Sequence, residues 1–207
     1  MCRTSRLKQA RTKCILLVCG LLLTPFVSAS EYIIDTKGAH AFIQFKIPHL
    51  GYSWLLGRFN SFSGRFGYDQ DEPSAAWIEV EIDTASIDTN HAERDKHLRG
   101  EDFLDSERFP KARFVSSDYK EATDGSGLLR GKLSLHGVTR PISISVQPVG
   151  AGMDPWGGYR RGFEGSASLL LKDYGIDFDL GPSATRVQLD LFIEGIRAKS
   201  DGRRIKR

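Results

Sequence analysis

Apolar and polar residues alternate along most of this 207-residue chain, and this period of two constrains the fold more than any other feature. In the segment 41–47, Ile43, Phe45 and Ile47 share one parity, and polar side chains take the other. Successive side chains of a strand point to opposite faces, so such a segment has one buried face. Comparable patterns occupy 57–68, 77–83, 113–120, 128–136, 142–149, 159–172 and 185–196.

Some eight alternating segments with short connections predict an all-β fold, an antiparallel eight-stranded β-barrel. A two-sheet sandwich is the structural alternative. Phe59 has the opposite parity to Phe62, and a β-bulge at 60–62 would reconcile them. We expect loops at Pro48–Trp54 and Gly150–Gly158, and a hairpin across the short connection that contains Gly137.

The first 29 residues have the features of a secretory signal peptide. Five basic residues precede a short apolar run, and small residues at 27–29 predict cleavage after Ala29. The apolar run is about ten residues, well short of the roughly 20 that span a bilayer. We therefore expect a periplasmic protein that consists of one domain, residues 30–207.

Removal of the signal peptide changes the composition. All three cysteines leave with it, so the mature chain can form neither a disulfide nor a thiolate metal site. Five of the 29 basic residues also leave, and the remaining 24 against 26 acidic residues give a formal charge of −2. This balance argues against nucleic-acid binding. The basic tail 197–207 is predicted to be disordered, and contact with a membrane surface is its functional interpretation.

One long segment, 89–114, interrupts the strands and is predicted to form a lid at one end of the barrel. Asn90 can cap a short helix, with Glu93 completing a capping box and Gly100 ending the helix. The helix is polar, and apolar anchors follow it at Phe103, Leu104 and Phe109. A charged helix followed by apolar anchors is suited to covering the end of a barrel.

The inward parity includes small residues at Gly131, Gly165 and Ala167, which can leave space along the barrel axis. Glycine in a curled sheet also marks bends or bulges. Since the inward faces carry almost no charge, a ligand inside would be apolar, with its polar end at the mouth. The lid and the loops around His49, Trp54 and Trp156 would supply donors and aromatic surfaces there.

Catalytic and metal sites are not indicated. His91 and His97 lie six residues apart, which is not the i, i+4 spacing that places two ligands on one helical face. The sequence Gly51-Tyr52-Ser53-Trp54-Leu55 lacks the last glycine of a nucleophile elbow. Charged residues such as Asp95 and Arg99 are spaced for a helical ion pair. We expect no cofactor, no metal and no enzymatic activity.

Several long motifs resemble one bacterial family. They are Ala85 to Arg99, Asp102-Phe103-Leu104-Asp105, His49 to Ser53, Gly131 to Pro141, Asp154 to Gly157 and Arg161 to Glu164. Together they resemble the signature of YceI-like proteins, in particular the secreted, periplasmic branch. The resemblance implies a lipocalin-like barrel that binds a polyisoprenoid chain, such as an isoprenoid quinone or a polyprenyl phosphate. Proposals for the family include isoprenoid transport and stress responses.

The resemblance implies no enzymatic reaction. Two functional hypotheses from different classes remain, and a stress-response protein without a stable ligand is a further alternative. The first is a periplasmic lipid carrier. Its candidate ligand-binding residues are Phe45, Phe66, Leu133, Leu135, Phe163 and Leu169, and its candidate lid or mouth residues are His49, Trp54, Arg94, Asp95, His97, Phe103, Phe109 and Trp156. The second is an enzyme that acts on a lipid pyrophosphate through the charged lid. A homodimer and a monomer both remain open.

Overall fold

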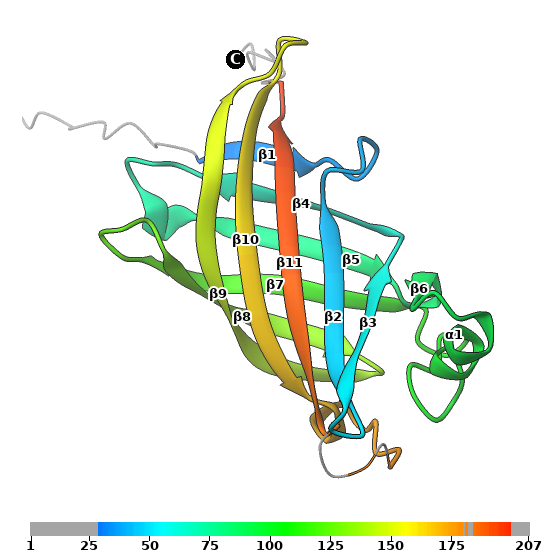
Figure 1. The fold of residues 1–207 in the computed structure, drawn as a ribbon. Helices are drawn as coiled ribbons and strands as arrows, with labels where there is room; N and C mark the ends of the chain where they lie inside the picture. Colours follow the sequence, from blue (N-terminus) through cyan, green and yellow to red (C-terminus); the bar gives the residue numbers. More distant parts are fainter. Residues whose placement is uncertain (1–28, 180, 182–183, 200–207) are drawn as a thin grey trace, which may run out of the picture.

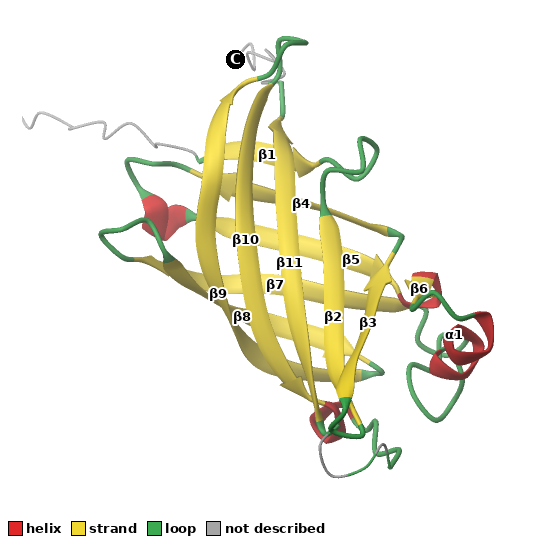
Figure 2. Ribbon diagram, viewed as in Figure 1, coloured by secondary structure: helices red, strands yellow, loops and turns green. Residues whose placement is uncertain are grey.

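The computed structural model describes residues 29–179, 181 and 184–199, and more than half of these residues lie in strands (Figures 1 and 2). The predicted signal peptide and most of the basic tail lie outside the described residues. The strands are β1 (Ser30–Ile34), β2 (Phe42–His49), β3 (Ser53–Phe59), β4 (Phe62–Tyr68), β5 (Trp77–Asp83), β6 (Ile87–Asp88), β7 (Lys111–Glu121), β8 (Gly127–Leu135), β9 (Val138–Met153), β10 (Tyr159–Leu170) and β11 (Arg186–Arg197). The helical elements are α1 (Ala92–Leu98) and three short 3-10 turns, η1 (Pro73–Ala75), η2 (Thr84–Ser86) and η3 (Leu171–Tyr174).

Eight of the strands form a closed ring. They follow one another in the order β1-β4-β5-β7-β8-β9-β10-β11, and β11 pairs with β1 to close the ring. Each neighbouring pair in the ring is antiparallel. The predicted eight-stranded antiparallel barrel is therefore confirmed, and the sandwich alternative is wrong.

Strands β2, β3 and β6 lengthen the wall of the ring at one end. Strand β11 pairs with β1 around Gly195 and with β2 between Phe192 and Gln188, so β1 and β2 follow the same edge. Strand β3 pairs with β2, and β6 pairs with β3 only at Arg58 and Phe59. Within the described part of the chain, residues 53–57 of β3 consequently have no strand partner on the side away from β2.

The β-bulge predicted at 60–62 is wrong, because the parity changes at a break between two strands. Strand β3 ends at Phe59, and β4 starts at Phe62. The rings of Phe59 and Phe62 both pack against the interior, because the two residues between the strands let each strand direct its phenylalanine inward. The break also allows β3 to follow β2 while β4 follows β1.

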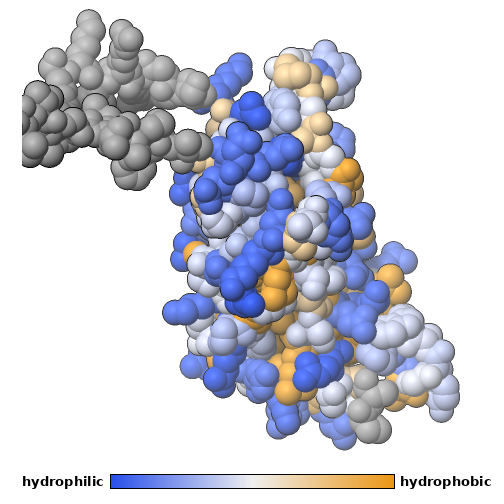
Figure 3. Space-filling view, turned by 90° about the vertical axis from the view of Figure 1, so that its left-hand side faces the viewer, coloured by the Kyte–Doolittle hydropathy of each residue, from blue (hydrophilic) through white to orange (hydrophobic). Residues whose placement is uncertain are grey.

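Large apolar side chains fill the inside of the barrel, and charged side chains cover its outside. The buried core includes Tyr32, Phe66, Phe114 and Leu133, each at most 6% exposed. On the outside, Arg65 of β4 pairs with Glu31 of β1 and with Glu79 of β5, and Arg113 of β7 also pairs with Glu79. A space-filling view shows hydrophilic residues over most of one side, with apolar patches between them (Figure 3).

Two predicted loops are wrong in their extent. Strand β2 continues through Pro48 and His49, and β3 begins at Ser53. The reversal needs only a tight turn, in which Leu50 and Gly51 have φ of 52° and 79°, the region that favours glycine. At the other loop, β9 runs to Met153, so its turn is confined to residues 154–158. The predicted hairpin at Gly137 is confirmed by the β8–β9 pairing.

The connections fall at two ends of the barrel. One end, called the mouth below, carries the β2–β3 turn, the segment 84–110 with α1, the β8–β9 turn and the β10–β11 connection (Figure 1). The other end, called the far end, carries the β4–β5, β7–β8 and β9–β10 connections. The β1–β2 connection leaves the wall in the same half of the barrel, beside residues 192–195 of β11. The short helix predicted within 89–114 is present, and it lies at the mouth.

The start of that helix differs from the prediction. His91 is the N-cap, and its Nδ1 accepts a hydrogen bond from the Arg94 N–H at 3.2 Å. Asn90 has φ of 60° and accepts no capping bond, so the Asn90–Glu93 capping box is wrong. The physical reason is that Asp88 Oδ1 accepts the Asn90 N–H at 2.9 Å, which turns the chain one residue later than expected.

Candidate functional site

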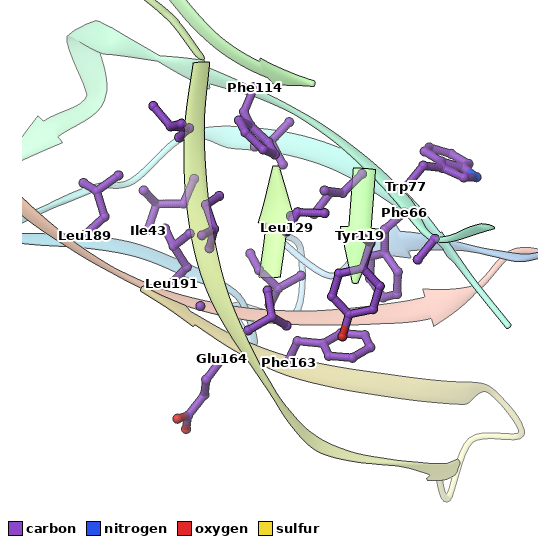
Figure 4. A pocket seen from close by; sticks show the side chains of 18 of the residues that line it. Ile43, Phe66, Trp77, Phe114, Tyr119, Leu129, Phe163, Glu164, Leu189 and Leu191 are labelled. Carbon is purple, nitrogen blue, oxygen red and sulfur yellow. The ribbon is translucent and has the colours of Figure 1, made fainter. Parts of the chain in front are cut away.

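The far half of the barrel encloses an apolar cavity of about 140 Å³, called the inner chamber below. In Figure 4, Ile43, Phe114 and Leu129 come from different strands around this space. Among the described residues of its lining, Glu164 alone is charged, and Figure 4 shows its carboxylate pointing away from the cavity. The inner chamber can therefore accept hydrocarbon and has no charged group to offer a polar ligand.

Aromatic rings close the inner chamber at the far end. Tyr68 and Tyr119 line it, and both donate a hydrogen bond to Glu121 Oε2, at 2.8 and 3.3 Å. Burial, together with the Glu121 carboxylate, raises the pKa of Tyr68 to about 12, and the same causes raise the pKa of Tyr119. Phe163 packs edge-on against Tyr68 and Phe66. Both tyrosines are thus neutral donors that lock this aromatic layer.

A second cavity of about 380 Å³, the outer chamber, extends from the inner one to the mouth. Ile43, Ile82, Leu133 and Leu189 line both chambers, so the two spaces meet at a waist formed by these side chains. The size of the outer chamber is in the usual range for small-molecule sites, roughly 300–1,000 Å³. The two chambers lie end to end with these side chains between them; together they are called the apolar path below.

All six predicted ligand-binding residues lie on this path. Phe66 and Phe163 line the inner chamber, and Leu133 lines both. The outer chamber receives Phe45, Leu135 and Leu169. The expected space above Gly131 is wrong, because a Cβ there would lie 2.5 Å from Phe114 Cζ; the Phe114 ring occupies that volume.

The segment after α1 plugs the mouth with apolar side chains. Phe103 and Leu104 are 6% and 8% exposed and belong to a core cluster with Phe45 and Ile87. His97 also faces the outer chamber; its ring packs edge-on against Phe103, with ring centroids 5.0 Å apart. The predicted position of this segment at the barrel end is therefore found, with Phe103 as its main anchor.

Thr89 joins the two charged residues that begin the helix. Asp95 is 8% exposed, and its Oδ1 accepts hydrogen bonds from the Thr89 N–H and hydroxyl. Arg94 donates from Nε to Thr89 Oγ1 and from a terminal nitrogen to the Thr89 carbonyl, both at 2.7 Å. Asp95 therefore fastens the predicted lid segment, to which it belongs, and it does not line the outer chamber.

A groove of about 570 Å³ runs outside the wall, along the unpaired edge of β3. Trp54 lines it from the outer face of β3 and is 49% exposed, so its side chain lies beside the mouth and not in it. His49 and Arg94 line both this groove and the outer chamber. These two polar side chains mark the boundary between the apolar path and water.

One predicted mouth residue lies at the other end of the barrel, and another lies at the mouth but outside the chambers. Phe109 packs against His136 of the β8–β9 turn, with ring centroids 4.9 Å apart, and lines neither chamber. Trp156 is at the far end, in the β9–β10 turn, where it is 79% exposed and lies 5.8 Å from the Arg160 guanidinium. The prediction for Trp156 was wrong because sequence alone does not assign a loop to one end of a barrel.

One group of side chains in the described part of the chain has the donor types and spacing of a metal site. Asp35, His40 and Glu194 place one donor atom each within 4.8 Å of one another. Arg160 donates to both carboxylates and, through Nε, to Asp154 at 2.7 Å. Its guanidinium already supplies the positive charge at this position.

None of the described helices is long and apolar enough to cross a bilayer.

Two features of the site were missed from the sequence. The sequence did not predict Tyr119 as an inward residue, because a register shift between Ser116 and Asp118 reverses its parity relative to Phe114. Phe178, in the β10–β11 connection, lines the outer chamber and lies 4.9 Å from Phe103 between ring centroids. Only an apolar residue within an otherwise polar loop could have indicated it.

Comparison with known proteins identifies the family. The model of the YceI-like domain matches residues 32–195. A UPF0312 protein of Shewanella denitrificans is 53% identical over 182 residues, which cover 88% of this chain and 95% of the relative.

Two solved structures have similar folds. BcnA of Burkholderia cenocepacia superposes with a TM-score of 0.69 at 20% identity, over 78% of this chain and 98% of that one. A polyisoprenoid binding domain from Saccharophagus degradans, implicated in plant cell wall breakdown, superposes with a TM-score of 0.59 at 18% identity, over 81% and 98%. The fold, the family model and the relatives agree, and the chain belongs to the YceI-like family.

Proposed function

We propose that this protein is a periplasmic carrier that holds the chain of one polyisoprenoid lipid inside its barrel. The observation that carries the proposal is the apolar path from the mouth through the waist to the aromatic layer at the far end. Its linear form suits a chain-like ligand, and its lining is almost entirely hydrocarbon. The polyisoprenoid binding domain with the same fold supports this class of ligand.

The energetics also favour a chain. Each buried methylene contributes about 0.8 kcal/mol, so an isoprene unit contributes very roughly 3 kcal/mol before ordering costs. A charged head group inside the chambers would lose its hydration without gaining a partner. We therefore place the polar end at the mouth, beside His49, Arg94 and His97, and the chain tip in the inner chamber.

The location follows from the N-terminal segment. A basic region, a short apolar run and small residues at 27–29 support export with cleavage after Ala29. Mass spectrometry of the protein recovered from periplasm tests this directly. A chain that still begins at Met1 would contradict the proposed export and cleavage.

Native mass spectrometry of detergent-free protein, followed by organic extraction, tests the ligand. The expected result is one polyisoprenoid per barrel. Empty protein that also takes up no added polyprenyl lipid would overturn the carrier function.

Leu189→Phe tests the path itself. Leu189 lines both chambers, and the larger ring at the waist should block passage to the inner chamber. We expect affinity for a long polyprenol to fall at least about tenfold, measured by quenching of intrinsic fluorescence. Gln188→Phe is the matched control, since Gln188 is the next residue and is exposed on the outer face. Equal affinity of the two folded variants would exclude the path as the binding site.

A further inference from the structure

Two arginines lie near each other on the inner face of the wall at the far end. Arg161 of β10 is opposite Gly195 of β11, and Arg197 follows two residues later on β11. The two are diagonal neighbours on one face, at a spacing of about 7–8 Å between Cα atoms. They lie beyond Tyr68, on the side of the aromatic layer that faces away from the inner chamber.

Neither guanidinium has a carboxylate partner within 4.0 Å among the described residues. Arg161 Nε is buried and has no hydrogen-bond partner there, and Arg197 makes one side-chain hydrogen bond, to the Tyr32 hydroxyl at 3.2 Å. Arg160, the next residue along the chain, pairs with three carboxylates. Of these three arginines, only the two that face inward lack a counter-charge among the described residues.

Tyrosine rings hold both guanidinium groups in place. The Arg161 guanidinium lies 4.5 Å from the Tyr68 ring centroid, and that of Arg197 lies 4.0 Å from the Tyr159 ring centroid. Stacking engages the flat faces and leaves the N–H edges available. Glu121, the nearby acid on β7, is hydrogen-bonded to Tyr68 and Tyr119. The two guanidinium groups are therefore held close together with N–H donors in a fixed orientation, an arrangement suited to binding an anion.

We propose that Arg161 and Arg197 form a phosphate-binding site at the far end of the barrel. A tetrahedral phosphate offers several oxygens to two planar forks, and charge-assisted bonds of this kind are the strong ones. Such an anion would bind the accessible N–H edges and neutralise the repulsion between the two positive charges. The site lies at the end opposite the proposed lipid head group, so it adds a function to the carrier and does not depend on it.

Titration of the full-length mature protein with inorganic phosphate tests the site, with backbone amide NMR shifts of β10 and β11 as the readout. The expected result is saturable binding that weakens at least about tenfold in Arg161→Gln/Arg197→Gln. Arg113→Gln/Arg130→Gln removes the same charge from outward arginines that are paired with Glu79 and Asp118, and should bind as the unsubstituted protein does. Arg161→Lys keeps the charge and loses the planar fork, and it supplies the comparison if the double variant does not fold.

Vesicles distinguish a lipid phosphate from a soluble one. If the natural anion is a phospholipid head group, the protein should float with phosphatidylglycerol vesicles, and the double variant should not. If it is soluble, phosphate binds and flotation is the same for both variants. No binding to either probe, or equal loss in the outward control, overturns the proposal.

Discussion

Asp35 lies in an environment unlike that of an ordinary surface carboxylate. It is 8% exposed and accepts from His40 Nδ1 at 3.0 Å and from Arg160 at 2.7 Å. These two partners, the His40 hydrogen bond first, lower the pKa of Asp35 from 3.8 to about 2. Since the lowered pKa belongs to the folded state, the ionised form stabilises the fold.

Because the pKa of Asp35 is lower in the folded state than in the unfolded state, Asp35 makes the stability of the protein depend on pH. The contribution of Asp35 is complete above its unfolded pKa of 3.8 and is lost as pH falls through about 2. It amounts to at most about 2 kcal/mol. Urea unfolding at pH 5 and pH 2 should show a smaller change in unfolding free energy for Asp35→Asn than for the unsubstituted protein. The same pH dependence in both would mean that the network does not act through this carboxyl group.

Residue-scale prediction from sequence succeeded where parity alone decides. Phe45, Phe66 and Phe163 follow the alternation of their strands, and each lines a chamber. The pairing of Asp35 with Arg160 joins residues 125 positions apart. Both lie next to turns in the far half of the barrel, and only closure of the barrel brings them together, so no local pattern could predict the contact.

At the scale of elements, the α1 segment depends on Asp95. Its carboxylate is the shared acceptor of the Thr89 N–H and hydroxyl, and removal would leave both donors buried. Asp95→Ala should lower the free energy of opening of residues 89–104 by about 1–3 kcal/mol, without the same loss in β8 to β10. Hydrogen exchange measures both regions. Glu93→Ala, at an exposed position on the same helix, is the control; equal effects of the two variants would contradict the role of Asp95.

The β2–β3 turn presents apolar side chains to solvent beside the mouth. Leu50 is 58% and Tyr52 is 87% exposed, and both lie where a lipid would leave. If the turn meets a membrane during exchange, Tyr52→Asp should slow lipid transfer between vesicles severalfold without changing equilibrium affinity. Trp156→Asp alters an exposed aromatic at the far end and should leave the rate unchanged. Transfer assays in which both variants behave alike would remove the turn from the exchange step.

Sequence reasoning found the elements better than their limits. The helix at 92–98 was predicted, but its cap was assigned to Asn90 because side-chain type favours it, whereas the Asp88 hydrogen bond moves the cap to His91. The predicted loop at 48–54 is mostly strand, because pairing with a neighbour overrides the local signal of Pro48. Tertiary pairing supplies these corrections.

At the scale of the whole molecule, alternation was sufficient to predict a closed barrel but not the shape of its interior. Gly131 and Gly165 look alike in the sequence, yet Phe114 covers the first while the second lines the inner chamber. The waist arises from Ile43, Ile82, Leu133 and Leu189, which come from four different strands. Side-chain rotamers and strand register decide such a constriction, and neither is written in a local pattern.

The layer of Tyr68 and Tyr119 at the far end limits the length of chain that the barrel can hold. A chain that enters at the mouth has a fixed depth to fill, since hydrogen bonds to Glu121 hold both rings in place. Each added isoprene unit should tighten binding until the tip touches the tyrosines, and further units should remain outside without benefit. The barrel would then sort lipids by length, and the chain end that goes in first must come out last.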